Sequence, residues 1–282
     1  MRHSKEHEQG MITREPTLRL ILLSTLILIL SLGVDGRVTR DNSTTSVYEN
    51  ATLALVWYQT SAECRALYYQ AFNTARLALD SDLRTRSYPK KRAIVFDIDA
   101  TILDDSPHSS MLLNQNKLFP YRYDEWIEAA REQPLPGALE FARYASSHGV
   151  ELFYISNRTT RMLNATLRNL QSAGFPQADE SHVLLMTGEA SKESRRKTVA
   201  VRHEIVLLLG DNLNDLSNAF EGGTISNRSA QVDSARTQFG SRYIVLPNPV
   251  YGAWESAVYQ YKSGLTEEQK DAWRKSVLKS FE

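Results

Sequence analysis

The 282-residue sequence contains a single cysteine, Cys64, and no excess of charge of either sign. One cysteine cannot form an intramolecular disulfide, and it excludes a zinc site built from several cysteines. Lysine plus arginine and aspartate plus glutamate number 33 each, so no net basic field draws the chain toward a nucleic acid polymer. Any anionic ligand must therefore be held by a local site.

The sequence also lacks a hydrophobic run long enough to cross a bilayer. Residues 20–34 (LILLSTLILILSLGV) form an uncharged stretch of 15 residues, which as a helix rises only about 22 Å against a hydrocarbon core of roughly 30 Å. Arg14 and Arg19 precede it, and the small residues Val34 and Gly36 fit the −3 and −1 positions of a cleavage site. We therefore predict a signal peptide over residues 1–36, with a retained N-terminal anchor and a buried helix as alternatives.

This N-terminal segment decides where the protein is expected to act. A cleaved signal predicts an exported protein, periplasmic or secreted, whereas an uncleaved one predicts membrane anchoring. No cysteine directly follows the apolar run, so we expect no lipoprotein attachment site. The sequence leaves open whether translation starts at Met1 or Met11. The polar residues 37–50 (RVTRDNSTTSVYEN) have no periodicity and predict a solvated linker.

From residue 51 onward, the hydrophobic pattern predicts alternating helices and strands. Apolar residues recur near a 3.6-residue period over 51–80, which favours a helix. Five apolar runs have the length of buried strands, at 93–98, 150–155, 182–186, 204–209 and 242–246. Helical segments are predicted between them, at 137–147, 159–172 and 191–202. This alternation is typical of an α/β fold, in which a parallel sheet has helices on both faces.

Polar and charged side chains that are suited to catalysis or metal binding follow the predicted strands. They are Asp97 and Asp99 after the first strand, Ser156 and Asn157 after the second, Asp211 and Asp215 after the fourth, and Lys192 at the start of the helix before the fourth strand. Ligands of parallel sheets bind at the carboxyl ends of the strands, so we expect these groups to gather there. Clustered carboxylates repel one another, and a divalent cation removes the repulsion. Oxygen-only ligands suit Mg²⁺.

Each of these signals is weak when taken alone. An Asp-x-Asp pair after a strand occurs in ordinary turns and caps, Ser156 is also suited to cap the next helix, and most lysines are solvated. Their order, each at a strand end or helix start, favours one shared site. Asp104 and Asp105, which follow closely, are expected to be turn or cap residues rather than ligands.

At these positions the sequence resembles the haloacid dehalogenase (HAD) superfamily. The motifs of that superfamily are hhhhDxDx[TV], a strand-end Ser or Thr, a Lys, and [GD]DxxxD, and the stretches here are IVFDIDAT, FYISN, SKESRR and LLLGDNLND. The sequence is more closely similar to the class C acid phosphatases, a bacterial group of secreted or outer-membrane lipoprotein 5'-nucleotidases, over about residues 51–260. Supporting stretches include WYQTSAECRALYYQAFNTARLALD, DIDATILDDSP and LPNPVYGAWESA.

The sequence departs from this family in two places. Ala100 stands where an acidic residue is expected between Asp99 and Thr101, and the lipid-accepting cysteine common among relatives is missing. The first departure is not expected to affect the chemistry. The second weakens the case for membrane anchoring. The resemblance implies a Rossmann-like HAD fold over residues 51–282, with a small helical cap inserted at about 104–134.

The resemblance also implies a Mg²⁺-dependent phosphomonoesterase, an acid phosphatase or 5'-nucleotidase, that forms an aspartyl-phosphate. Asp97 would be the nucleophile and Asp99 the general acid and base. The metal would be held by Asp97, by Asp211 and by the backbone carbonyl of Asp99, with Asp215 binding a metal water or orienting the others.

Substrate recognition is predicted to combine a phosphate site with aromatic rings. Ser156, Asn157 and Lys192 would hold the phosphoryl oxygens. Aromatic residues are usually core, but three of them flank the expected site and are candidates for stacking a nucleobase: Tyr123, Trp126 and Tyr251. The expected substrates are nucleoside monophosphates and other small phosphate monoesters, and a homodimer is one option for the oligomeric state.

Three other functions remain as alternatives. A dehalogenase would need neither Asp99 nor the metal ligands, and both are present. A phosphotransferase would share every motif and differ only in the acceptor that competes with water. A non-catalytic surface binding protein would tolerate loss of the acids, and none is lost.

Overall fold

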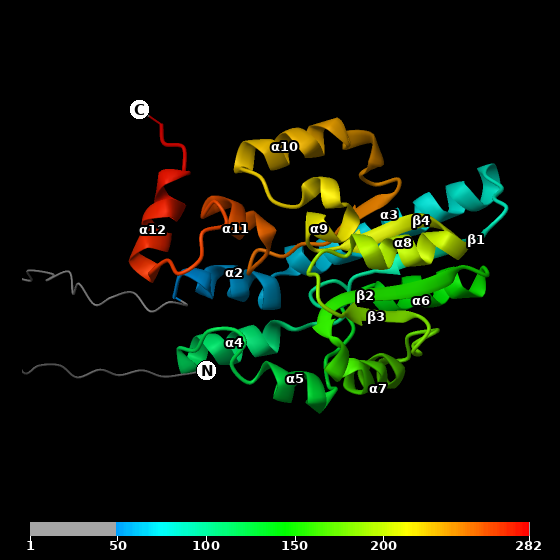
Figure 1. Cartoon of the computed structure of the whole chain (residues 1–282), viewed down its shortest axis with the longest axis horizontal. Helices are drawn as coiled ribbons and strands as arrows, with labels where there is room; N and C mark the ends of the chain where they lie inside the picture. Colours follow the sequence, from blue (N-terminus) through cyan, green and yellow to red (C-terminus); the bar gives the residue numbers. More distant parts are fainter. Residues whose placement is uncertain (1–48, 282) are drawn as a thin grey trace, which may run out of the picture. The chain divides into compact units, whose positions relative to one another are not determined.

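Five parallel strands form one sheet in a computed structural model that describes residues 49–281. The strands are β1 (Lys91–Phe96), β2 (Glu151–Thr159), β3 (Val183–Met186), β4 (His203–Gly210) and β5 (Tyr243–Val245). They are arranged in the order β3-β2-β1-β4-β5 (Figure 1). Each predicted strand is present within a few residues of its expected position, and the predicted α/β fold is confirmed.

Helices cover both faces of this sheet. They are α2 (Glu49–Thr60), α3 (Ala62–Thr85), α4 (Ser106–Gln115), α5 (Tyr123–Ala129), α6 (Ala138–Ser147), α7 (Leu163–Ala173), α8 (Glu193–Arg202), α9 (Leu213–Leu216), α10 (Ile225–Ser234), α11 (Ala253–Val258) and α12 (Glu267–Ser276). Short 3-10 turns lie at Thr160–Met162, Asn218–Phe220 and Arg236–Gln238. None of the helices within residues 49–281 has both the length and the apolar character needed to cross a membrane.

Alternation along β1 divides the apolar core between the two faces. Ile94 and Phe96 pack with α3, α6 and α7, while Ala93 and Val95 pack with α8 and α9. Side chains of successive strand residues point to opposite faces, so a strand that is buried on both sides has a continuous apolar sequence. This explains why the strongest apolar runs of the sequence are the central strands.

The predicted helix over 51–80 is in fact two helices. Ser61 ends α2 and caps α3, because its side chain accepts a hydrogen bond from the Cys64 amide at 3.0 Å. Such a capping bond satisfies an amide that has no partner within its own helix.

The predicted signal peptide at 1–36 and most of the linker at 37–50 lie outside the described residues, and α2 already begins at Glu49.

The segment predicted to form a cap, residues 104–134, contains the two helices α4 and α5. Helix α4 packs against α2, and α5 packs against α7 (Figure 1).

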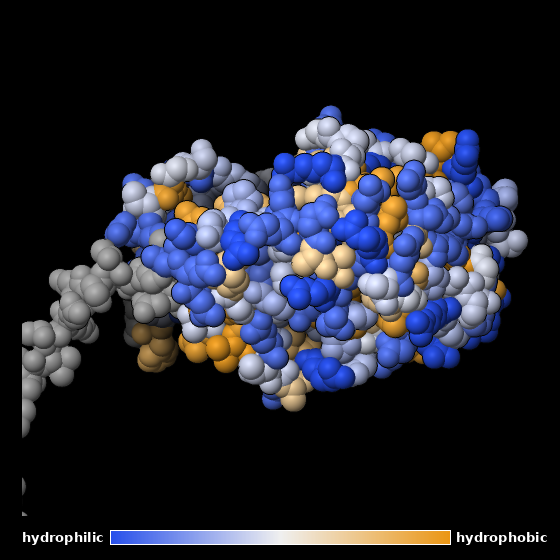
Figure 2. All heavy atoms as spheres, turned by 90° about the horizontal axis from the view of Figure 1, so that it is seen from below, coloured by the Kyte–Doolittle hydropathy of each residue, from blue (hydrophilic) through white to orange (hydrophobic). Residues whose placement is uncertain are grey.

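Figure 2 shows one face of the molecule, on which hydrophilic atoms predominate and apolar atoms form small separate groups. Isolated apolar side chains of this kind are normal on a protein surface.

The register of the strands brings three chain segments to one edge of the sheet. Phe96, the last residue of β1, is paired with Tyr154 of β2 and with Leu209 of β4. The chain adds β2 and β3 on one side of β1 and β4 and β5 on the other, so the order of the sheet reverses between β1 and β4. Loops diverge at such a switch point, which is where ligands of open parallel sheets bind.

Candidate active site

The loop after β1 makes a tight turn that is set by a left-handed residue. The Asp97 amide continues the ladder by donating to the Leu209 carbonyl at 2.9 Å. Ala100 then adopts φ 56°, and its amide donates to the Leu103 carbonyl at 3.0 Å. Ala100 is buried at 1% exposure, so an apolar residue suits the position where an acid was expected. The turn keeps both Asp97 and Asp99 at the edge of the sheet.

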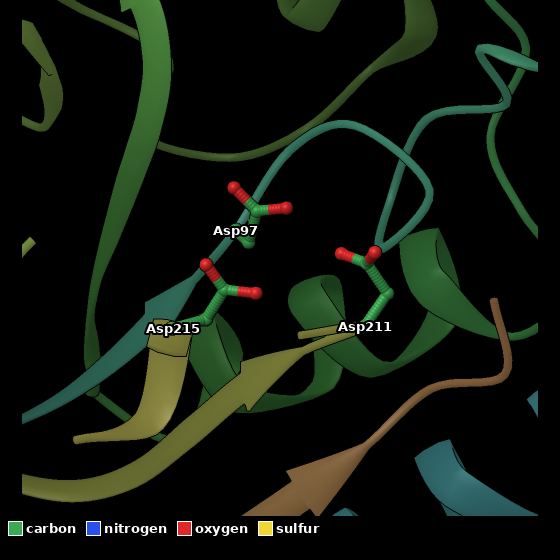
Figure 3. Close-up of side chains that lie close together, drawn as sticks. All are labelled: Asp97, Asp211 and Asp215. Atoms are coloured by element: carbon green, nitrogen blue, oxygen red, sulfur yellow. The ribbon is translucent and has the colours of Figure 1, made fainter. Parts of the chain in front are cut away.

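An acidic cluster, defined as Asp97, Asp211, Asp215 and Lys192, lies where β1 and β4 end. One side-chain oxygen from each of the three carboxylates lies within 4.8 Å of the others (Figure 3). The buried ammonium of Lys192 contacts Asp97 and lies 2.7 Å from Oδ1 of Asp215. If all three carboxylates were ionised, they would exceed the one ammonium by two negative charges.

Neighbouring groups hold two of these carboxylates in place. The Thr101 hydroxyl donates to Oδ1 of Asp211 at 3.0 Å, and the Asn248 amide donates to Oδ2 at 2.8 Å. Asp215 accepts from the Asn212 amide at 3.0 Å as part of a capping box at α9. Gly210 leaves room for this arrangement, because a Cβ atom there would lie 2.4 Å from Cβ of Asp215. The glycine of the GDNLND motif is therefore a steric requirement.

The electrostatics of the acidic cluster show that its negative charge is undercompensated. Burial raises the pKa of Asp97 to about 6, although Lys192 opposes this rise. Burial, with Asp215 and Asp97 close by, raises the pKa of Asp211 well above its ordinary value. Burial alone would lower the pKa of Lys192, but the neighbouring Asp215 and Asp97 outweigh it and raise that pKa. A divalent cation would relieve this crowding.

A second group, the arginine cluster, consists of Asp99, Arg158 and Glu132. Nη2 of Arg158 lies 2.7 Å from Oδ1 of Asp99 and 2.6 Å from Oε2 of Glu132, and the Arg158 side chain has 0% exposure. Burial acts to raise the pKa of Asp99, but Arg158 outweighs it, so this pKa is lowered. Burial raises the pKa of Glu132 to about 8 despite Arg158.

The residues predicted to bind phosphate converge on the same edge. Ser156 is buried in β2, and its hydroxyl donates to Oδ2 of Asp99 at 3.2 Å. Asn157 is exposed, and its Oδ1 accepts from the Arg195 guanidinium at 2.7 Å. Together with Lys192, Ser156 and Asn157 line a cavity of about 890 Å³ that also contains Asp97, Asp99, Asp211 and Asp215.

The predicted aromatic residues do not all face this cavity. Tyr123 and Tyr251 line it. Trp126 is not among the lining residues, although its ring packs against Ile127 and Met162 as Tyr123 does. The structure thus brings Tyr123 and Tyr251 to the cavity but not Trp126, whose stacking role stays a prediction. Periodicity within a short helix such as α5 does not reveal which of its faces meets the cavity.

Asp104 and Asp105 lie at the start of α4, as expected, but Asp105 also contacts the cavity. Asp104 does act at a helix start, since its Oδ1 accepts from the Ser106 amide at 3.0 Å. Asp105 occupies the cap position of α4 but makes no capping bond. It lines the cavity and accepts a 2.5 Å hydrogen bond from the Tyr251 hydroxyl. Burial raises its pKa to about 7, and the nearby Asp99 adds to this rise.

Sequence reasoning assigned no role to three residues that support the site. Arg158 directly follows Ser156 and Asn157, so a charge at the end of a buried strand was a usable signal. Asn248 follows β5 in LPNP and was open to the same strand-end reasoning. Glu132 lies in a loop with no local motif, and only the tertiary structure brings it to Arg158.

A parallel α/β sheet with these motif residues at its switch point defines a HAD-type protein. The chain belongs to the HAD superfamily, subfamily IIIB (acid phosphatase), whose family model matches residues 29–254. It is similar to the class C acid phosphatase from Bacillus anthracis, solved with tungstate bound. The two are 44% identical with a TM-score of 0.81, and the match covers 84% of this chain and 100% of the other. A second structure of the Bacillus anthracis class C acid phosphatase matches at 43% identity with the same TM-score and coverage.

Plant proteins are more distant relatives. The Stem 28 kDa glycoprotein of Glycine max and Acid phosphatase 1 of Solanum lycopersicum are each 26% identical to this chain, over 172 and 167 residues. These matches cover 57% and 56% of this chain. The chain thus spans 60% of the length of the first of these curated relatives and 57% of the second.

Proposed function

We propose that this protein hydrolyses phosphate monoesters through an aspartyl-phosphate on Asp97, with Mg²⁺ as its cofactor. The observation that carries the proposal is the convergence of Asp97, Asp211, Asp215 and Lys192 in one cavity at the switch point of the sheet. This combination supplies a nucleophile, oxygen ligands for a cation and a fixed positive charge for a phosphoryl group. Membership of an acid phosphatase family supports the same reaction.

The acidic cluster fits a hard divalent cation. Its donors are all carboxylate oxygens and lie close together, and the burial and crowding that raise the pKa of Asp211 favour an added positive charge. We assign Asp97 and Asp211 as ligands, with Asp215 as a ligand or as an orienting group. When bound there, Mg²⁺ would offset the negative charge of the phosphoryl oxygens. A ligand role for the Asp99 backbone carbonyl stays a prediction.

Two carboxylates divide the proposed chemistry. Asp97 attacks phosphorus while the bond to the leaving oxygen breaks, and Asp99 gives that oxygen a proton. Asp99 then takes a proton from water, which attacks the phosphorylated Asp97, releases phosphate and restores the carboxylate. Its lowered pKa suits the second step. In the first step, the dianionic substrate beside Asp99 favours the protonated form.

The remaining polar residues of the cavity would bind the phosphoryl group. Lys192 is a buried cation beside Asp97, while Ser156 and Asn157 present a hydroxyl and an amide. Donors fixed in a buried site stabilise charge that develops in the transition state. Tungstate, present in the Bacillus anthracis structure, is a tetrahedral oxyanion like phosphate. We therefore propose that it binds here and competes with substrate.

Phosphate release from a panel of monoesters, with Mg²⁺ or with excess chelator, tests this function. We expect release with Mg²⁺, loss in chelator and competitive inhibition by tungstate. Added alcohols would reveal transfer in place of hydrolysis through a phosphorylated alcohol as product. No release from any ester under any metal condition would refute the proposed function.

We further propose that nucleoside 5'-monophosphates are preferred over small sugar phosphates. Tyr123 and Tyr251 line the cavity, and stacking on a ring contributes about 1–3 kcal/mol per base with little base discrimination. Tyr123→Ala should raise KM for adenosine monophosphate by roughly 5- to 150-fold on that range while changing glycerol phosphate little. Trp126→Ala is the matched control, because that ring packs against the same apolar cluster as Tyr123 but does not line the cavity. Equal losses for both substrates in Tyr123→Ala would contradict stacking.

Export is the remaining proposal, and it concerns the N-terminal segment. We propose that cleavage after residue 36 yields a mature chain that begins near residue 37 in the periplasm or medium. N-terminal sequencing of the native protein tests this. An intact start at Met1 or Met11 on membrane-bound material would favour the anchor instead.

A further inference from the structure

The arginine cluster contains a carboxylate that the proposed reaction does not use. Glu132 is 2% exposed, and its Oε2 lies 2.6 Å from Nη2 of Arg158. Its Oε1 is buried and has no hydrogen-bond partner among the described residues. A carboxyl group buried this deeply costs free energy unless its oxygens are paired. The placement of Glu132 therefore calls for an explanation beyond the filling of space.

Arg158 connects Glu132 to Asp99 with little freedom to move. Nε of Arg158 lies 3.2 and 3.1 Å from the two carboxylate oxygens of Asp99, and Nη2 lies 2.7 Å from Oδ1. Nη1 donates to the Thr166 hydroxyl at 3.3 Å. A planar guanidinium that contacts both oxygens fixes the plane of a carboxylate, which a point charge cannot do.

Glu132 is itself anchored to α7. Its amide donates to Oδ1 of Asn169 at 3.0 Å, and the Asn169 side-chain amide donates to the Glu132 carbonyl at 2.8 Å. Asn169 is buried, at 1% exposure. The backbone of Glu132 is thus tied down on both sides, and its carboxylate is presented to Arg158 from a fixed point.

We propose that Glu132 is a positioning residue: it holds Arg158, and Arg158 holds the Asp99 carboxyl in the orientation needed for proton transfer to the leaving oxygen. This inference rests on the proposed phosphomonoesterase function. In the step concerned, the bond from Asp97 to phosphorus forms, the bond to the leaving oxygen breaks, and the proton of Asp99 passes to that oxygen. Proton transfer requires close alignment of donor and acceptor.

The leaving group supplies a readout that a purely structural role would not change. An alkoxide, as from glycerol phosphate, leaves poorly without a proton, whereas p-nitrophenolate leaves readily without one. Misalignment of Asp99 should therefore slow the first substrate far more than the second. The ratio of the two kcat/KM values for one preparation does not depend on the fraction of protein that is folded.

Glu132→Gln is the principal variant, since it keeps the shape and replaces the carboxyl group that contacts Arg158 with an amide. We expect kcat/KM for glycerol phosphate to fall about 10- to 100-fold, as when an orienting partner is lost, with p-nitrophenyl phosphate changing less than about threefold. The fall should lie in kcat rather than KM, because Glu132 does not contact the cavity. Arg158→Lys keeps the positive charge but loses the planar guanidinium. We expect it to change the ratio of the two kcat/KM values at least as much as Glu132→Gln does.

Asp82→Asn is the matched control at a distance from the site. Oδ1 of Asp82 lies 2.6 Å from Nε of Arg92, so the variant makes the same carboxylate-to-amide change opposite an arginine. It should lower thermal stability without changing the substrate ratio. If Glu132→Gln and Arg158→Lys slow both substrates equally, or neither, the positioning role is wrong while the phosphatase function stands. If the wild-type protein releases phosphate from neither substrate, the proposed function itself fails.

Discussion

The acidic cluster and the arginine cluster lie at the same edge of the sheet, yet they treat the same residue type in opposite ways. Asp97 belongs to the acidic cluster, and burial raises its pKa to about 6. Asp99, two residues later, belongs to the arginine cluster, and Arg158 outweighs burial to lower its pKa. Asp97 contacts Lys192 and Asp99 contacts Arg158, so two carboxyl groups only two residues apart have different partners.

The difference lies in how each cluster is compensated. Three carboxylates share one ammonium in the acidic cluster, whereas two share one guanidinium in the arginine cluster. An ammonium is a compact point charge, while a guanidinium fixes the plane of the carboxylate that it contacts. We conclude that the acidic cluster is suited to accept a further cation, and that the arginine cluster is suited to hold one carboxyl group in a set direction.

The largest expected effect comes from removing the nucleophile of the acidic cluster. Asp97→Asn keeps the shape of the side chain but not its attacking oxygen, so kcat should fall on the order of 10⁴-fold or more. Turnover of p-nitrophenyl phosphate measures this, with circular dichroism to verify the fold. Activity near that of the wild type would exclude the covalent mechanism.

Metal dependence should also separate the two clusters. Asp211→Ala should weaken Mg²⁺ activation by roughly 10- to 100-fold, and Asp215→Ala by less, because Asp211 is assigned as a direct ligand whereas Asp215 is a ligand or an orienting group. Glu132→Gln, in the arginine cluster, should leave the Mg²⁺ concentration for half-activation unchanged. Titration of activity with Mg²⁺ in chelated preparations provides these values. A shift in Glu132→Gln as large as that in Asp211→Ala would show that the clusters are not separate.

Stability without metal should change in opposite directions at the two sites. A carboxyl with a raised pKa is more easily charged in the unfolded chain, so at neutral pH Asp211→Asn should stabilise the protein by about 1 kcal/mol. Asp99 has a lowered pKa, so its charge is favoured in the fold, and Asp99→Asn should destabilise by about 1–3 kcal/mol. Urea unfolding in excess chelator measures both. Changes of the same sign would contradict the contrast between the clusters.

A third charged group, formed by His182 with Glu151 and Asp179, is partly exposed and can be compared with the two buried clusters. His182 lies between Glu151 and Asp179, 3.0 and 2.9 Å away, just before β3. Burial opposes protonation, but the two carboxylates outweigh it and raise the pKa of His182. Its stabilisation is therefore present below the unfolded-state pKa and is lost as pH rises through the folded value. His182→Gln should cost at most about 1 kcal/mol at about pH 5.5 and less at about pH 8.5. An equal cost at both values in urea unfolding would contradict this.

The sequence was sufficient for the strands and for the residues at their ends. Buried strands have continuous apolar runs, and parallel strands end at one edge, so Asp97, Ser156 and Asp211 were placed together correctly. The roles of Asp105 and Glu132 depend on contacts with Tyr251 and Arg158, far away in the chain. Local patterns contain no information on such contacts, nor on which face of α5 carries Trp126.

Trapping the covalent intermediate tests the central claim most directly. Asp99→Asn lacks the base for the second step, while p-nitrophenolate needs no acid in the first, so mixing the two should give a burst of nitrophenol and a stalled phosphoenzyme. Acid quenching, digestion and mass spectrometry then locate the phosphoryl group. The account predicts it on the peptide that contains Asp97, at Asp97 itself. Release of nitrophenol with no phosphorylated peptide, or with the phosphoryl group on another residue, would contradict the account.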